Sequence, residues 1–228
     1  YGRSLTIREE LGDKRGMGLT LNSIGIMHSD KGDYEKALDY HGRSLSINEE
    51  LGDKRGIGNS LHNIGNVHMN KGDSDTALDY LRRALAIREE LDNKSGMGYS
   101  LNSMGIVHYN KGSYEQAVEH LEKSLSIQKE IGLGADDLIW VTPYLYLTYK
   151  QLNKDYDEKD IQSLIKNAEN IGYELNFRLY ELLGDNSYLE SAYSQVQETA
   201  DNLEPDVATK FLSYPIPKAI VEAWEKVK

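Results

Sequence analysis

The sequence predicts an all-α solenoid built from antiparallel helix pairs. A block of 40 residues recurs three times, at 12–51, 52–91 and 92–131. Within each block, apolar residues recur at three- and four-residue steps in two stretches, as on the buried face of a helix. No long stretch alternates with the period of two that is typical of a strand. Self-similarity at a fixed period of this size indicates stacked repeats that bury their apolar faces against their neighbours.

The first eleven residues predict a partial repeat. Residues 1–11 (YGRSLTIREEL) match residues 41–51 (HGRSLSINEEL), which form the second half of the first complete unit. We therefore expect 1–11 to be the second helix of a truncated repeat, with further sequence before it.

Each clear unit predicts two helices. In the first unit, residues 15–30 carry the first apolar stripe and residues 34–51 carry the second. Gly32 between them suits the left-handed position that ends a helix, and Asp33 suits the N-cap of the next one. The other two clear units have the same plan.

The repeat becomes irregular after residue 131. The 40-residue spacing continues through 132–171, but Leu145 replaces a glycine and Asp157 replaces an alanine of the clear units. We expect 132–171 to be a degenerate fourth unit. Terminal repeats depart from the pattern because their outer face meets water.

The last segment, 172–228, predicts a degenerate helix pair and a capping helix. The pair is expected over 173–202, with its turn at Gly184-Asp185. An irregular proline-containing link is expected next, and a final helix from about Pro217.

A signature of small and apolar residues runs through the clear units. In the first it reads Leu21-x-x-Ile24-Gly25-x-x-His28, then Gly32-Asp33-Tyr34, then Ala37-x-x-x-His41-x-x-Ser44. This signature resembles the tetratricopeptide repeat. The period is 40 rather than the usual 34, and histidine replaces the aromatic residue of the first helix. The longer variant, with GDKRG before the first helix, resembles the repeats of Pins-type polarity adaptors and kinesin light chains.

The resemblance implies a right-handed superhelix whose first helices line a concave groove for an extended peptide. It places groove residues on those helices as follows: Asn22 and Ile26 in the first unit, Asn59, His62, Asn66 and Asn70 in the second, Tyr99, Asn102 and Tyr109 in the third, and Tyr146 in the fourth.

Asparagine is the informative residue type in this set. Its amide competes with the backbone inside helices, so asparagine there carries a local cost. A carboxamide both donates and accepts hydrogen bonds, which suits the main chain of a bound peptide. The tyrosines would supply apolar walls with hydroxyl groups. The alternative interpretation is a solvated surface that merely tolerates asparagine.

Charge narrows the range of partners. The formal net charge is −11 and the pI is about 5.0, with no basic stripe, so we do not expect a nucleic acid partner. The groove positions of the clear units hold no Lys or Arg, which a site for a peptide C-terminal carboxylate needs. We therefore do not expect such a carboxylate clamp.

No catalytic, metal or cofactor site is predicted. The chain has no cysteine, and no nucleophile is paired with a base. His28, His68 and His108 lie on successive units, expected about 10 Å apart or more, whereas ligands of one zinc lie about 2 Å from the ion. We expect packed histidines and a protein that is not an enzyme.

The best functional hypothesis is a protein-interaction scaffold or adaptor that binds an extended segment in its groove. Two alternatives remain: a regulatory peptide-sensing domain of a signalling protein, and a scaffold that self-associates by end-to-end stacking or helix swapping. No apolar run approaches the roughly 20 residues of a membrane span, so no membrane partner is expected. A cytoplasmic location is expected.

Overall fold

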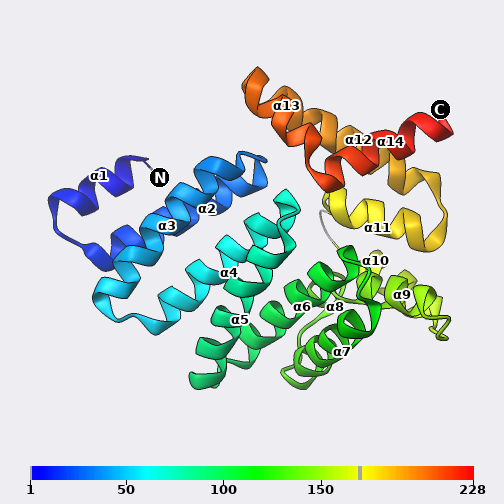
Figure 1. Cartoon of the computed structure of the whole chain (residues 1–228), viewed down its shortest axis with the longest axis horizontal. Coiled ribbons are helices and arrows are strands. Elements are labelled where there is room, and N and C mark those ends of the chain that lie inside the picture. The colour runs from blue at the N-terminus through cyan, green and yellow to red at the C-terminus, as the bar shows by residue number, and fades with distance from the viewer. Residues whose placement is uncertain (1, 169–170) are drawn as a thin grey trace.

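The computed structural model describes residues 2–168 and 171–228, and over these it contains fourteen α-helices and no strand (Figure 1). The predicted all-α helical solenoid is therefore confirmed. Tyr1 of the predicted segment 1–11 and residues 169–170 of the predicted unit 132–171 lie outside the described residues.

The three clear units form three helix pairs after a first short helix. The bounds are α1 (Gly2–Glu10), α2 (Lys14–Asp30), α3 (Tyr34–Leu51), α4 (Lys54–Lys71), α5 (Ser74–Glu90), α6 (Lys94–Asn110) and α7 (Tyr114–Glu130). The helices of each pair pack on each other, and the second helix of one pair packs on the first helix of the next. The predicted helices at 15–30 and 34–51 agree with α2 and α3 to within one residue.

Side-chain and backbone caps fix the ends of these helices. Asp13 accepts a hydrogen bond from the backbone N–H of Gly16 at 2.9 Å, which satisfies a free donor at the start of α2. Gly52 ends α3 with φ of 64°, a left-handed conformation that glycine adopts without strain. Asp33 lies at the N-cap of α3 as predicted, but its side chain makes no cap bond and instead pairs with Lys36 at 2.8 Å.

Close helix approach within a pair depends on the repeated glycine of the first helix. A Cβ atom on Gly105 would lie 2.5 Å from Cγ of Leu121, a side chain with no exposed surface. The position equivalent to Ala117 is also fully buried in all three clear units. These small residues let the two helices of a pair pack at short range.

After α7 the chain forms three shorter helices, α8 (Ala135–Leu138), α9 (Thr142–Gln151) and α10 (Glu158–Asn167). Helix α9 packs against α6 and α7, as the first helix of a fourth unit would. It also packs against α11, whereas α10 packs against α8. The unit boundaries proposed at 132–171 and 172–228 stay predictions.

The C-terminal segment forms α11 (Tyr173–Leu183), α12 (Asn186–Asp201), α13 (Pro205–Ser213) and α14 (Pro215–Val227). Helices α11 and α12 form the pair expected over 173–202. The irregular link expected before Pro217 is replaced by α13, and α14 begins two residues earlier than expected. Both helices begin with proline, which lacks the N–H that a first helical turn leaves unpaired.

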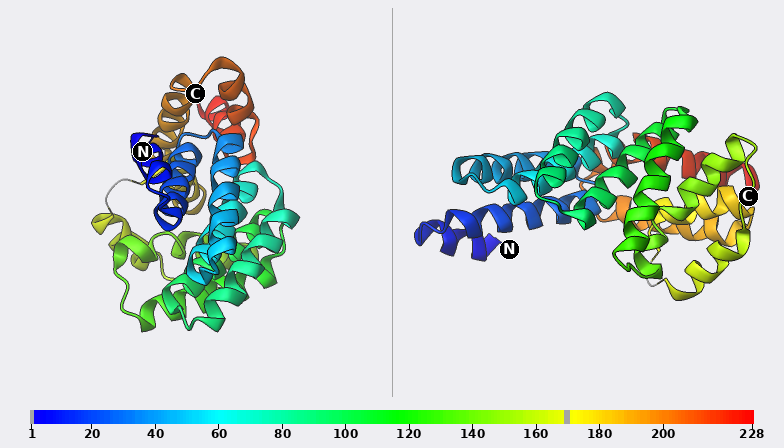
Figure 2. Two further views of the ribbon diagram at one scale, coloured as in Figure 1. Left: turned by 90° about the vertical axis from the view of Figure 1, so that its left-hand side faces the viewer. Right: turned by 90° about the horizontal axis from the view of Figure 1, so that it is seen from below.

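The C-terminal helices pack back onto the first two units. One buried cluster joins Tyr34 and Val67 to Phe211, Tyr214 and Ile220. Phe211 has no exposed surface and lies against the turn between α2 and α3. Figure 1 shows α13 and α14 beside the ends of α2 and α4, and Figure 2 shows α1 at one end of the molecule and the α9–α12 region at the other. From the C-terminal helices, Glu174 and Leu175 of α11 share a cavity with residues of α2, α4 and α6.

Candidate functional site

The main candidate site is a cavity of about 410 Å³ on the concave side of the first helices. Each of these helices presents side chains at four-residue steps on this side, because such residues share one helical face. Six of the ten predicted groove residues line the cavity: Ile26, His62, Asn66, Asn70, Tyr99 and Asn102. Its size is within the usual range of ligand sites.

Two of the remaining predicted residues lie on the concave helices but do not line the cavity. Asn22 uses its side-chain oxygen to accept hydrogen bonds from His41 Nδ1 at 3.0 Å and Asn63 Nδ2 at 2.9 Å. Asn59 is exposed, and its oxygen accepts a weak bond from Arg88 at 3.4 Å. The bond between Asn22 and Asn63 joins the first and second units, whereas the bond between Asn59 and Arg88 lies within the second unit.

Tyr109 and Tyr146 pack into the core around α9. The Tyr109 ring meets Tyr144 edge to face at a centroid distance of 5.5 Å, and burial raises its pKa to about 12. Tyr146 is 8 % exposed and donates a hydrogen bond to Asp160 at 3.0 Å. These tyrosines stabilise the junction of the third unit with the following helices.

Residues at one repeat position have different partners in different units. Asn22 in the first unit faces His41, which saturates its oxygen. At the repeat position of His41 the third unit has Leu121, whose side chain has no hydrogen-bond donor to offer Asn102. Asn102 is 8 % exposed, its Nδ2 donates to the carbonyl of Trp140 at 3.4 Å, and its Oδ1 has no hydrogen-bond partner. An unpaired buried amide oxygen costs about 1–3 kcal/mol, so such groups point to function.

The second unit adds further unpaired polar atoms. Asn66 Nδ2 contacts His62 Nε2 at 3.1 Å, which leaves Asn66 Oδ1 and His62 Nδ1 without partners. Because Nε2 accepts this bond, the proton of the neutral imidazole lies on Nδ1. The cavity lining therefore holds buried acceptors on α4 and α6 that the fold itself does not use.

The later helices contribute a wall that the sequence did not reveal. Trp140 follows α8, Tyr144 lies on α9, and Glu174 and Leu175 lie on α11; all four line the cavity. Tyr99 is tied to this wall by a hydrogen bond to Asp137 at 2.9 Å. These residues lie beyond the three clear units, where no repeat position marks them as facing the groove.

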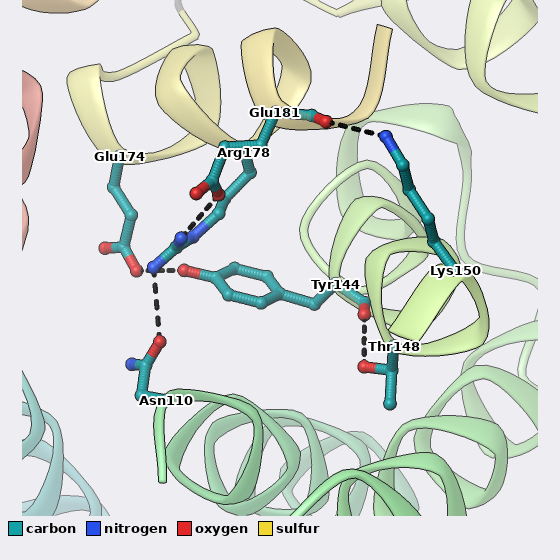
Figure 3. Close-up of polar contacts among 7 residues, drawn as sticks. All are labelled: Asn110, Tyr144, Thr148, Lys150, Glu174, Arg178 and Glu181. Atoms are coloured by element: carbon teal, nitrogen blue, oxygen red, sulfur yellow. Dashed lines mark hydrogen bonds and ion pairs between the residues drawn. The ribbon is translucent and has the colours of Figure 1, made fainter. Parts of the chain in front are cut away.

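A polar cluster holds α11 against α6 and α9 (Figure 3). Arg178 is 5 % exposed; it pairs with Glu181 at 2.6 Å, donates to Asn110 at 3.1 Å and lies 5.1 Å from the ring centroid of Tyr144. The Tyr144 hydroxyl donates to the Glu174 carboxylate. Among the described residues, Arg178 pairs with Glu181 and Glu174 forms no ion pair, while Glu174 lines the cavity and holds the Tyr144 hydroxyl.

The cavity is electrically negative. Asp30 and Glu174 line it, and the described lining residues include no Lys or Arg. Burial lowers the pKa of His41 to about 4, and burial together with the nearby Arg88 lowers that of His62 to about 3. Both imidazoles are therefore neutral at pH 7. Partial burial raises the pKa of Asp30.

Arg88 is a buried cation between the second and third units. It is 5 % exposed and donates to Ser100 Oγ at 2.6 Å and to the Gly96 carbonyl at 2.9 Å. Burial lowers its pKa to about 10. The equivalent residues of the neighbouring units are the neutral Asn48 and Gln128, so the charge is particular to this junction.

The repeated histidines of the first helices are packing residues. His28 stacks on Tyr40 with ring centroids 5.4 Å apart, and His108 stacks on His120 at 5.2 Å. Over residues 2–168 and 171–228, no group of three or more His, Cys, Asp or Glu residues is placed to hold a metal ion. In the same residues, no helix combines the length and apolar character that crossing a membrane requires.

Family models and solved structures agree on the repeat type. Models of the tetratricopeptide repeat match residues 18–51 and 56–130. The crystal structure of BtubC (BKLC) from P. vanneervenii is similar with a TM-score of 0.56 and 15 % identity, over 79 % of each chain. A Podosopora anserina protein provisionally assigned as a kinesin light chain, with nearly identical TPR-like repeats, has a TM-score of 0.52 and 15 % identity. That match covers 90 % of this chain and 94 % of the other. No curated protein matches the chain significantly in sequence.

Proposed function

Because this chain is a tetratricopeptide-repeat protein whose repeats resemble those of kinesin light chains, we propose that it is a scaffold or adaptor module that binds an extended segment of a partner protein on its concave side. Repeats of this kind mediate protein–protein interaction and are typically non-enzymatic. The cavity lined by α2, α4 and α6 is the proposed binding site.

The observation that carries this proposal is the mixture of unpaired polar atoms and exposed apolar side chains in one cavity. Asn66 and Asn102 each have an amide oxygen that no other group of the fold satisfies. Ile26, Tyr99 and Trp140 line the same cavity and are 42 %, 38 % and 47 % exposed. Exposed apolar groups beside a few convergent polar groups are typical of binding sites.

Repeat-matched substitution offers a sharp test. The position of Asn66 is isoleucine in both neighbouring units, at Ile26 and Ile106, so Asn66→Ile suits the local fold. Asn102→Leu replaces the second amide with an apolar side chain of similar shape. The double variant should keep its unfolding temperature and lose the two unpaired amide oxygens, while Asn63 and Asn70 remain in the lining.

A library of random linear dodecapeptides displayed on phage is selected against the wild-type protein. We expect related sequences to be enriched and to bind in the micromolar range, with at least a tenfold loss of affinity in the double variant. Glu119→Gln, on the exposed outer side of α7, serves as the matched control and should bind as the wild type does. Failure to enrich any sequence, or equal binding to the double variant, would refute the proposal.

A further inference from the structure

The charged groups of the cavity favour a positively charged ligand group. Asp30 and Glu174 lie on α2 and α11, and neither forms an ion pair within the described part of the chain. Two buried arginines lie behind the lining: Arg178 pairs with Glu181 and lies against Tyr144, and Arg88 lies near His62. A cation entering the cavity would therefore meet two carboxylates and no competing lysine or arginine in the lining.

The unpaired acceptors provide a second, independent observation. Asn102 is more than nine-tenths buried, and its Oδ1 needs a donor that Leu121 cannot supply. This oxygen is covered in the free protein, but the last torsion of asparagine is broad, so a small rotation presents it to a ligand. Asn66 lines the same cavity, and its Oδ1 is likewise covered and unpaired in the free protein. The lining thus offers acceptors on several sides to a ligand rich in N–H donors.

The apolar part of the lining is aromatic. Tyr99 and Trp140 are 38 % and 47 % exposed and lie in the cavity with the acceptors. Aromatic faces attract cations, and the planar guanidinium of arginine stacks on them better than the compact ammonium of lysine does. A guanidinium also presents five N–H donors in a fixed plane, so it can reach several separate acceptors at once.

We propose that the cavity is a specificity pocket for an arginine side chain of the partner segment. This inference rests on the proposed function and adds to it the chemistry of the bound residue. The net charge of −11 supports it, because an acidic chain attracts a basic partner over long range.

The test uses small probes that do not depend on finding the partner. N-acetyl-arginine amide is titrated into the isotope-labelled full chain, and the side-chain amide signals of asparagine and the indole signal of Trp140 are followed by NMR. The expected result is saturable shifts at Asn66, Asn102 and Trp140 with a Kd near 1 mM, which is the scale for so small a ligand. Asn22, whose oxygen is already saturated, is the internal control and should not shift.

Matched probes and variants decide the chemistry. N-acetyl-citrulline amide, which keeps the shape and loses the charge, should bind at least tenfold more weakly, and the lysine probe about fivefold more weakly. Glu174→Gln, which can still accept from Tyr144, should weaken arginine binding about tenfold. Asp30→Asn, which copies Asn70 of the next unit, should weaken arginine binding about threefold, because Asp30 is only partly buried and solvent screens its charge. No arginine-induced shift, equal binding of all three probes, or unchanged binding to Glu174→Gln would overturn the inference.

The two proposals fail in different ways. Displayed peptides that need Asn66 and Asn102 but carry no arginine or lysine would support the proposed function and contradict the arginine pocket. Saturable arginine binding without any enriched peptide would support the pocket and contradict the extended-segment function.

Discussion

His41 should couple the stability of the first repeat to pH. The side chain is 1 % exposed, it packs against Gly25, and its Nδ1 donates to Asn22. Burial lowers its pKa from 6.5 to about 4. A folded-state pKa below the unfolded one means that the unfolded chain binds the proton more readily. The contribution of neutral His41 to the free energy of unfolding is therefore complete above pH 6.5 and is lost as the pH falls toward 4. A difference of roughly 2.5 units corresponds to about 3 kcal/mol.

The repeat itself supplies the control for this prediction. Leucine occupies the equivalent position in the other two clear units, at Leu81 and Leu121, so His41→Leu suits the fold. Asn22 keeps its bond from Asn63 in this variant. Urea unfolding of both proteins is followed by circular dichroism at several pH values. Between pH 6.5 and 4 the free energy of unfolding of the wild type should fall by about 3 kcal/mol more than that of the variant, because the two proteins share all other titrating groups. Parallel stability curves would refute the burial argument.

Three further predictions concern packing and electrostatics. Gly105→Ala should lower the free energy of unfolding by about 1 kcal/mol, because overpacking against Leu121 outweighs the gain in helix propensity. Gly42→Ala should raise the free energy of unfolding by about 0.5–1 kcal/mol, because a Cβ atom there meets open space. Equal effects of the two substitutions in urea unfolding would contradict the packing account. Phe211→Ala should cost about 3–5 kcal/mol and raise amide hydrogen exchange in α13 and α14; unchanged protection there would show that these helices do not depend on the contact. Arg88→Gln, which copies the third unit, should raise the pKa of His62 in an NMR titration, and a constant value would exclude the proposed charge effect.

Helix bounds in the clear units could be predicted because local signals determine them. Gly52 ends α3 in the left-handed conformation and Asp13 caps α2, and both signals are visible in the sequence. The helices of the C-terminal segment are harder to predict, because a proline at the start of a helix and a proline in an irregular link give the same signal in the sequence. Only the packing partner distinguishes them. Phe211 buries its ring against the first unit, and that long-range contact makes α13 part of the core.

The cavity could be predicted only where the repeat register holds. Asn66 and Asn102 were assigned by register, and both line the cavity. The register also predicts Tyr146 in the groove. The repeat pattern is lost around α9, however, and the Tyr146 ring is buried in the core. No repeat position predicts Glu174 in the cavity, because α11 lies beyond the clear units and reaches the cavity through tertiary packing. The difference between Asn22 and Asn102 does lie in the sequence, in the exchange of histidine for leucine on the facing helix.

A crystal structure of the protein with an arginine-containing peptide selected from the displayed library tests the central claim most directly. The account predicts a peptide along α2, α4 and α6, with a guanidinium within about 3.2 Å of Asn102 Oδ1 and facing Glu174. A peptide bound to the outer helices α3, α5 and α7, or a concave complex with the arginine outside the cavity, would contradict it.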